Sequence, residues 1–95
     1  MTTPRSEVYK ALDSERDYQD KRWENYRGLD GVHENATDRT LDEFILYMEE
    51  YLQMARSHSV HGQEAEGLNM VRKVTALGVG CMERHGAPQR EGFER

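Results

Sequence analysis

The sequence has few of the residues that cross-link or interrupt a small domain. Its single cysteine excludes an internal disulfide. No apolar run approaches the roughly 18 residues that suggest a membrane-spanning helix, and no signal peptide is recognisable. No basic run could neutralise a phosphate backbone, and the net charge of −5 argues against general nucleic-acid binding. We therefore expect one soluble domain, residues 1–95, in the cytoplasm and without a membrane partner.

Apolar residues are present in a helical pattern between residues 63 and 85. They recur at steps of three and four, which predicts a helix: Leu68, Val71, Val74, Leu77, Cys81 and Met82. Gly86 and Pro88 form a typical helix stop. Gly80, four residues after Ala76, suggests that another backbone comes close. Cys81 lies inside this apolar helix, so we interpret it as a buried small hydrophobe rather than a reactive thiol.

A second helix is predicted over residues 40–57. Thr40 and Glu43 have the spacing of a capping box at its start. A regular stripe of apolar residues follows: Leu41, Phe44, Ile45, Met48, Leu52 and Ala55. The short connector to the third helix, residues 58–62, predicts that the two helices are antiparallel neighbours.

The first helix is predicted over residues 4–26, with Thr3 as its cap and Pro4 at its first position. Its apolar positions are Val8, Ala11, Leu12, Tyr18, Trp23 and Tyr26. The charge run at 13–22 is expected to be mainly a solvated face. The two aromatics at the helix end are interpreted as core anchors, with a lid over a ligand as the alternative. Residues 28–39, which include His33, are expected to form a loop, and residues 87–95 a polar tail.

These elements predict an all-α, three-helix unit in which an antiparallel hairpin is crossed by the first helix. The hairpin has more apolar positions than one largely charged helix can cover. We therefore expect a homodimer that completes the core. The predicted seam is the stripe containing Leu77, Cys81 and Met82 on the third helix.

Few residues have the spacing of a chemical site. His58 and His61, with Glu64, could occupy one helical turn as metal ligands, but a polar connector is the more ordinary reading. Glu49 and Glu50 are adjacent on the second helix, so they point in different directions, and a magnesium site would need further carboxylates from a facing helix. No cofactor is implied by these patterns.

Three stretches of the chain resemble a group of small phage and prophage proteins, which in turn resembles the MazG-like all-α nucleotide pyrophosphohydrolases. They are ERDYQDKRW at 15–23, FILYMEEYL at 44–52 and RKVTALGVGCMERHGAP at 72–88. The hydrolases bind magnesium through Glu-Glu-x-x-Glu on one helix and Glu-x-x-Asp on the next. In this sequence Gln53 replaces the last acid of the first motif, and Arg72 and Lys73 occupy the region of the second. The resemblance implies a shared fold, and the departures imply that hydrolysis is lost.

The leading interpretation is a non-catalytic phage or prophage accessory protein that binds a host protein, such as a host defence or regulatory factor, in the host cytoplasm. One alternative is a divergent pyrophosphohydrolase that uses Glu49, Glu50 and Glu66 with magnesium. Another is a nucleotide sequestrant in which Arg72 and Lys73 meet phosphates and an aromatic ring stacks on a base. The predicted ligand or partner contacts are Asp17, Asp20, Trp23, Tyr26, Arg72 and Lys73.

Overall fold

The computed structural model describes residues 2–30 and 39–91, with side chains described as far as Arg22 in the first helix. Three helices account for most of these residues: α1 (Arg5–Asp30), α2 (Leu41–Val60) and α3 (Glu64–His85). No strand occurs within the described ranges. The all-α prediction is confirmed.

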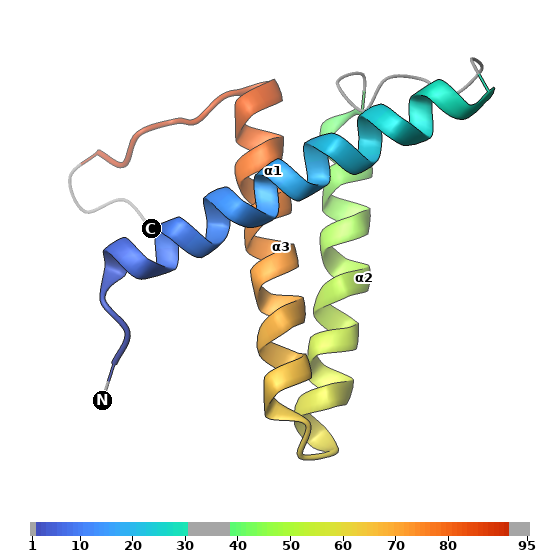
Figure 1. Ribbon diagram of the computed structural model, residues 1–95. Helices are drawn as coiled ribbons and strands as arrows, with labels where there is room; N and C mark the ends of the chain where they lie inside the picture. The colour runs from blue at the N-terminus through green and yellow to red at the C-terminus, as the bar shows by residue number, and fades with distance from the viewer. Residues whose placement is uncertain (1, 31–38, 92–95) are drawn as a thin grey trace.

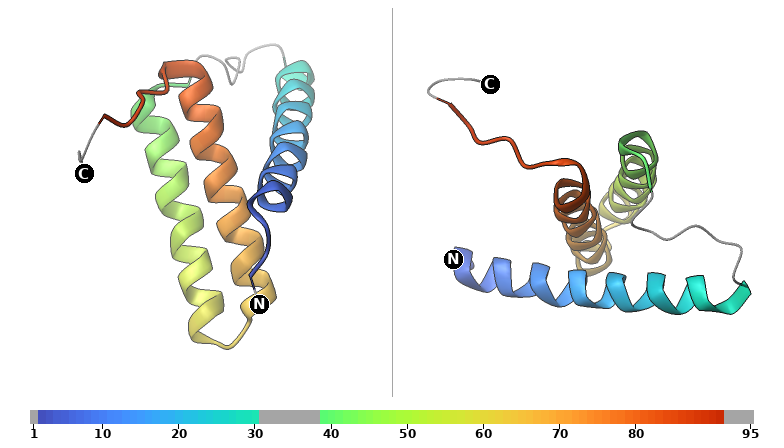
Figure 2. Two further views of the ribbon diagram at one scale, coloured as in Figure 1. Left: turned by 90° about the vertical axis from the view of Figure 1, so that its left-hand side faces the viewer. Right: turned by 90° about the horizontal axis from the view of Figure 1, so that it is seen from above.

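α3 is the middle element of the fold. α2 lies antiparallel beside it along most of its length, and α1 crosses it on another side (Figure 1; Figure 2). The predicted hairpin and crossing helix are therefore both present. Gly62, in the turn between α2 and α3, has a φ of +73°, a left-handed conformation that favours glycine.

The ends of α2 and α3 follow their sequence signals. The Thr40 hydroxyl accepts a 3.1 Å hydrogen bond from the Glu43 amide, and the Glu43 carboxylate accepts one of 3.2 Å from the Thr40 amide. The capping box is therefore confirmed. α3 stops at Gly86, whose φ is +116° and whose amide donates to the Met82 carbonyl. α2 continues to Val60, beyond the predicted end at residue 57.

α1 differs from its predicted bounds at both ends. It begins at Arg5, because the Pro4 carbonyl accepts the first hydrogen bonds, from the amides of Glu7 and Val8. It continues through Gly28 to Asp30, where a loop was predicted to have begun. A single glycine costs only about 1 kcal/mol in a helix, too little to end one. The remaining loop residues, 31–38, which include His33, lie outside the described part of the chain.

The buried core is small. Phe44 of α2 is the one large side chain among the described residues that is fully buried, at 0% exposure. Its ring meets the His85 ring edge-on at 6.0 Å between centroids. His85 Nε2 in turn donates a 2.8 Å hydrogen bond to the Arg39 carbonyl. These contacts fasten the end of α3 to the start of α2. The smaller buried apolar residues are Ala55, Ala76, Leu77 and Cys81.

The apolar stripes of α2 and α3 are only partly buried within the chain. In α3, Leu77 and Cys81 are 5% and 8% exposed, so both are covered by the chain's own helices. The predicted dimer seam through these two residues is therefore wrong, although Met82 does remain exposed. The members of the two stripes that are exposed are Leu41, Ile45, Leu52, Leu68, Val71 and Met82.

Candidate functional site

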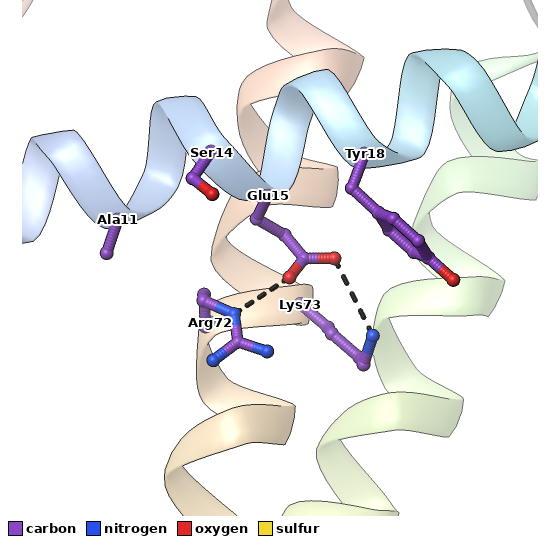
Figure 3. A pocket seen from close by; sticks show the side chains of 6 residues that line it. All are labelled: Ala11, Ser14, Glu15, Tyr18, Arg72 and Lys73. Carbon is purple, nitrogen blue, oxygen red and sulfur yellow. Dashed lines mark hydrogen bonds and ion pairs between the residues drawn. The ribbon is translucent and has the colours of Figure 1, made fainter.

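The contact between α1 and α3 is built largely from charged side chains. Glu15 of α1 is only 6% exposed. Its carboxylate accepts a 2.8 Å hydrogen bond from Arg72 Nε and lies 3.6 Å from Lys73 Nζ (Figure 3). A buried carboxylate is costly unless it is paired and hydrogen-bonded. The two cations, from consecutive residues of α3, account for its burial.

Arg16, the next residue of α1, is also buried and forms a second cluster. Its Nε donates to Glu83 of α3 at 2.7 Å, and its Nη2 donates to Asp20, one turn along α1, at 3.0 Å. The guanidinium lies against Gly80, where an added Cβ would be 3.3 Å from Arg16 Cζ. The glycine therefore makes room for a charged side chain of α1, not for the backbone that the sequence suggested.

The Arg16 cluster holds both partners in their charged forms. The hydrogen bond from Arg16 lowers the pKa of the Glu83 carboxyl, although burial acts against this shift. Burial alone would lower the pKa of the Arg16 guanidinium, but the hydrogen bonds to Glu83 and Asp20, together with the attraction of their negative charges, raise that pKa. The cluster is therefore suited to fastening α1 to α3 at neutral pH, not to exchanging protons.

A hollow of about 460 Å³ lies beside the Glu15 carboxylate. Residues of both α1 and α3 line it (Figure 3): Ala11, Ser14, Glu15, Tyr18, Arg72 and Lys73. Lys73 Nζ lies 5.5 Å from the centroid of the Tyr18 ring, within the range of a cation–π contact. Both cations of the hollow are engaged by Glu15. A phosphate group entering it would have to compete with a buried carboxylate.

The predicted contact residues do not form one site. Arg72 and Lys73 share Glu15, and Asp20 pairs with Arg16. Asp17 is exposed elsewhere on α1. The side chains of the two predicted aromatics lie outside the described part of the chain: Trp23 and Tyr26.

The predicted magnesium ligands Glu49 and Glu50 are exposed on α2, and so is Gln53. Glu66 is exposed near the start of α3. Across residues 2–30 and 39–91, no group of three or more histidine, cysteine or acidic side chains is placed to hold a metal ion.

The two histidines of the connector contribute to the α2–α3 turn. His61 Nδ1 donates to the Ser57 carbonyl at 2.7 Å, and His58 Nδ1 lies 2.8 Å from Gln63 Oε1. Both contacts are local to the turn. They give these side chains a structural role at the end of the hairpin.

Sequence reasoning missed the residues that fasten α1. Glu15, Arg16 and Gln19 are buried, whereas the charge run containing them was expected to be mainly solvated. Gln19 also reaches α3, since its Nε2 donates to the Lys73 carbonyl at 3.4 Å. One signal was present: these residues continue, at steps of three and four, the helical stripe that begins at Leu12. Because these residues are polar or charged, they were not counted as part of the apolar stripe.

Comparison with protein-family models, with curated proteins and with solved structures finds no match to this chain. Within the described ranges, none of the helices combines the length and the apolar character required to cross a membrane.

Proposed function

We propose that the protein is a non-catalytic binding protein that acts by contact with another protein, using the first turns of α1. If the chain is phage-borne, as the resemblance implies, the partner is a host protein such as a defence or regulatory factor. The proposal rests on one observation: the start of α1 extends beyond the hairpin and keeps apolar side chains in solvent.

The exposed part of α1 has the pattern of a groove-binding helix. Its first turns lie to one side of α3, with neither α2 nor α3 beneath them (Figure 1; Figure 2). Val8 and Tyr9 are 43% and 59% exposed there. Val8 begins a series with Ala11 and Leu12 that has the i, i+3, i+4 spacing with which an amphipathic helix enters an apolar groove. Ala11 also lines the hollow shared with α3, so Val8 and Tyr9 are the residues that lie clear of the hairpin. The partner that fits this surface carries an apolar groove about one helix wide.

The charges beside the hollow support protein binding over nucleotide sequestration. Arg72 and Lys73 are the groups that the sequestrant alternative requires, and Glu15 already pairs with both. A bound phosphate would leave the buried Glu15 carboxylate without these partners, which is unfavourable. Binding of a protein to the first turns of α1 leaves the ion pairs of Glu15 intact.

Site-specific photo-crosslinking tests the proposal in native host cells. A photoreactive phenylalanine analogue replaces Tyr9, and the same analogue at Lys10 is the matched control, because Lys10 is exposed and lies about 160° around the helix axis from Val8 and about 100° from Tyr9. We expect a discrete heterologous adduct from position 9 and little from position 10. Val8→Glu should reduce this adduct at least about tenfold, because it places a charge in an apolar groove. An equal yield from both positions, or none from either, would contradict the proposal.

A further inference from the structure

A second apolar surface lies on the side of the hairpin away from α1. Six large side chains form it, and each is between 43% and 61% exposed: Leu41, Ile45 and Leu52 of α2, and Leu68, Val71 and Met82 of α3. We refer to these six residues as the back face. Surfaces of this kind on a small protein usually mark an interaction site.

Helical geometry places the six residues on one side. With about 100° per residue, Leu41, Ile45 and Leu52 fall within one narrow stripe of α2, and the three residues of α3 form another. The two stripes meet at Met48 and Gly78, since a Cβ on Gly78 would lie 3.4 Å from Met48 Cε.

The same geometry separates the back face from α1. Ala76 and Gly80 lie on the α1 side of α3, with Gly80 directly beneath Arg16. Val71 is five residues from Ala76, which turns it about 140° around the helix axis. α1 therefore leaves the back face uncovered.

The composition of the back face suits a second copy of the same surface. In a twofold dimer each residue meets a surface identical to its own, so a charged centre would repel itself. Between Leu41 and Leu52 on α2 and between Leu68 and Met82 on α3, the charged residues nearest to the two stripes are Glu49 and Arg72, each turned about 40° beyond the edge of its stripe. The centre of the face is therefore uncharged, and an uncharged surface pairs with itself without that penalty.

The side of the hairpin that carries the back face is also large enough for a dimer. α3 has 22 residues and is therefore about 33 Å long, and a helical hairpin is about 20 Å wide. The whole of this side, which extends beyond the six residues, has a projected area of about 660 Å², near the roughly 800 Å² per partner of a stable interface.

Charged residues of opposite sign extend the two stripes at the turn end of the hairpin. Arg56 follows Leu52 by four residues, and Glu64 precedes Leu68 by four. A twofold axis parallel to the helices would set Arg56 of one copy near Glu64 of the other. The edge of the face is therefore self-complementary as well.

We propose that a second copy of this chain packs on the back face, so that two hairpins form a four-helix bundle with one α1 on each outer side. This assembly does not depend on the proposed contact through α1. It leaves both α1 helices accessible, and the complex presents two copies of that surface.

Light scattering coupled to size exclusion, with the full chain at about 100 µM, tests this assembly. The wild type is expected to return twice the 11.1 kDa of one chain. Leu52→Glu, measured at the same concentration, should return the mass of one chain. The change acts twice in a symmetric dimer, so we expect the dissociation constant to rise at least about 100-fold.

The matched control is Leu46→Glu. Leu46 is on the same helix and is 64% exposed, against 56% for Leu52, but it points away from the back face. This variant should remain a dimer. Leu68→Glu, on α3, should behave like Leu52→Glu. Circular dichroism checks that each variant keeps its helices.

Several outcomes would overturn the proposal. If the wild type has the mass of one chain, or of more than two chains, it does not form the closed dimer that we propose. A Leu52→Glu and a Leu68→Glu variant that both remain dimeric place the interface elsewhere, and so does a Leu46→Glu variant that dissociates. A monomeric wild type whose residue 52 photo-crosslinks to a different protein would assign the back face to a heterologous partner.

Discussion

At the scale of single residues, the position of α1 depends on an arginine lying over a glycine. Arg16 Nε and Nη1 would lie 3.4 and 3.7 Å from a Cβ added to Gly80. The guanidinium is held in place by Glu83 and Asp20, so it cannot easily move aside. Any side chain at position 80 therefore acts on the whole α1–α3 contact.

Gly80→Leu tests this packing. The larger side chain should overpack the contact and lower the free energy of unfolding by about 1–3 kcal/mol. Gly67→Ala is the control, because a Cβ there would make only ordinary contacts, the nearest at 3.5 Å from the Ala55 carbonyl oxygen. It should raise the free energy by up to about 1 kcal/mol through helix propensity. A higher melting temperature for Gly80→Leu would show that the Arg16 contact is absent.

Glu83 should give the stability a pH dependence of predictable sign. Its pKa is lower in the folded than in the unfolded state, chiefly because of the hydrogen bond from Arg16. The unfolded state therefore binds more protons in acid. The stabilisation is fully present above the ordinary glutamate pKa of about 4.3 and is lost as the pH falls through the folded-state value.

Urea denaturation between about pH 6 and pH 3 measures this effect. Glu83→Gln should lose less stability over this range than the wild type. The Glu83 side chain is 52% exposed, so the difference should stay below about 1 kcal/mol. Glu49→Gln, at an exposed position of α2, is the control and should follow the wild type. Identical pH profiles for Glu83→Gln and the wild type would mean that the ion pair contributes nothing.

At the scale of the elements, local sequence signals predicted where the helices begin and end, but not which side chains of one helix pack against another helix. The capping box at Thr40 and the stop at Gly86 placed helix ends correctly, because these signals act within a few residues. The burial of Glu15 and Arg16 could not be predicted in this way. Their partners Arg72 and Glu83 lie 57 and 67 residues away along the chain, and periodicity carries no information about such pairs.

Thr40→Ala tests the cap of α2. The change removes the acceptor for the Glu43 amide and should cost about 1 kcal/mol of stability. Thr3→Ala is the matched control, because α1 begins at Arg5 with the Pro4 carbonyl as its first acceptor. It should change the stability by less than about 0.5 kcal/mol. Chemical denaturation measures both, and equal losses would assign Thr3 the capping role that the sequence first suggested.

At the scale of the whole molecule, the chain is more open than a compact domain of its length. Its radius of gyration is 15.1 Å, against about 13 Å for a compact domain of 100 residues. The projecting α1 accounts for part of this difference (Figure 2). The sequence indicated a surplus of apolar positions in the hairpin, but it could not say which of them the chain covers itself. One apolar stripe of a helix is wide enough to contact two neighbouring helices. For this reason the sequence pattern placed Leu77 in the dimer seam, although the chain's own helices cover it.

The proposed dimer makes the stability of the whole molecule depend on protein concentration. Association through the back face stabilises the folded state by mass action, by about 2.7 kcal/mol for a hundredfold increase well above the dissociation constant. For a unit of about 190 residues, each kcal/mol shifts the melting temperature by about 2–4 °C. The melting temperature of the wild type should therefore rise by about 5–10 °C between about 2 and 200 µM.

Leu52→Glu should melt at nearly the same temperature at both concentrations, and Leu46→Glu should follow the wild type. Each of these leucines is at least half exposed in the single chain, so a difference between the two variants reports the interface and not the fold. A wild-type melting temperature that does not change with concentration would contradict a dimer linked to folding.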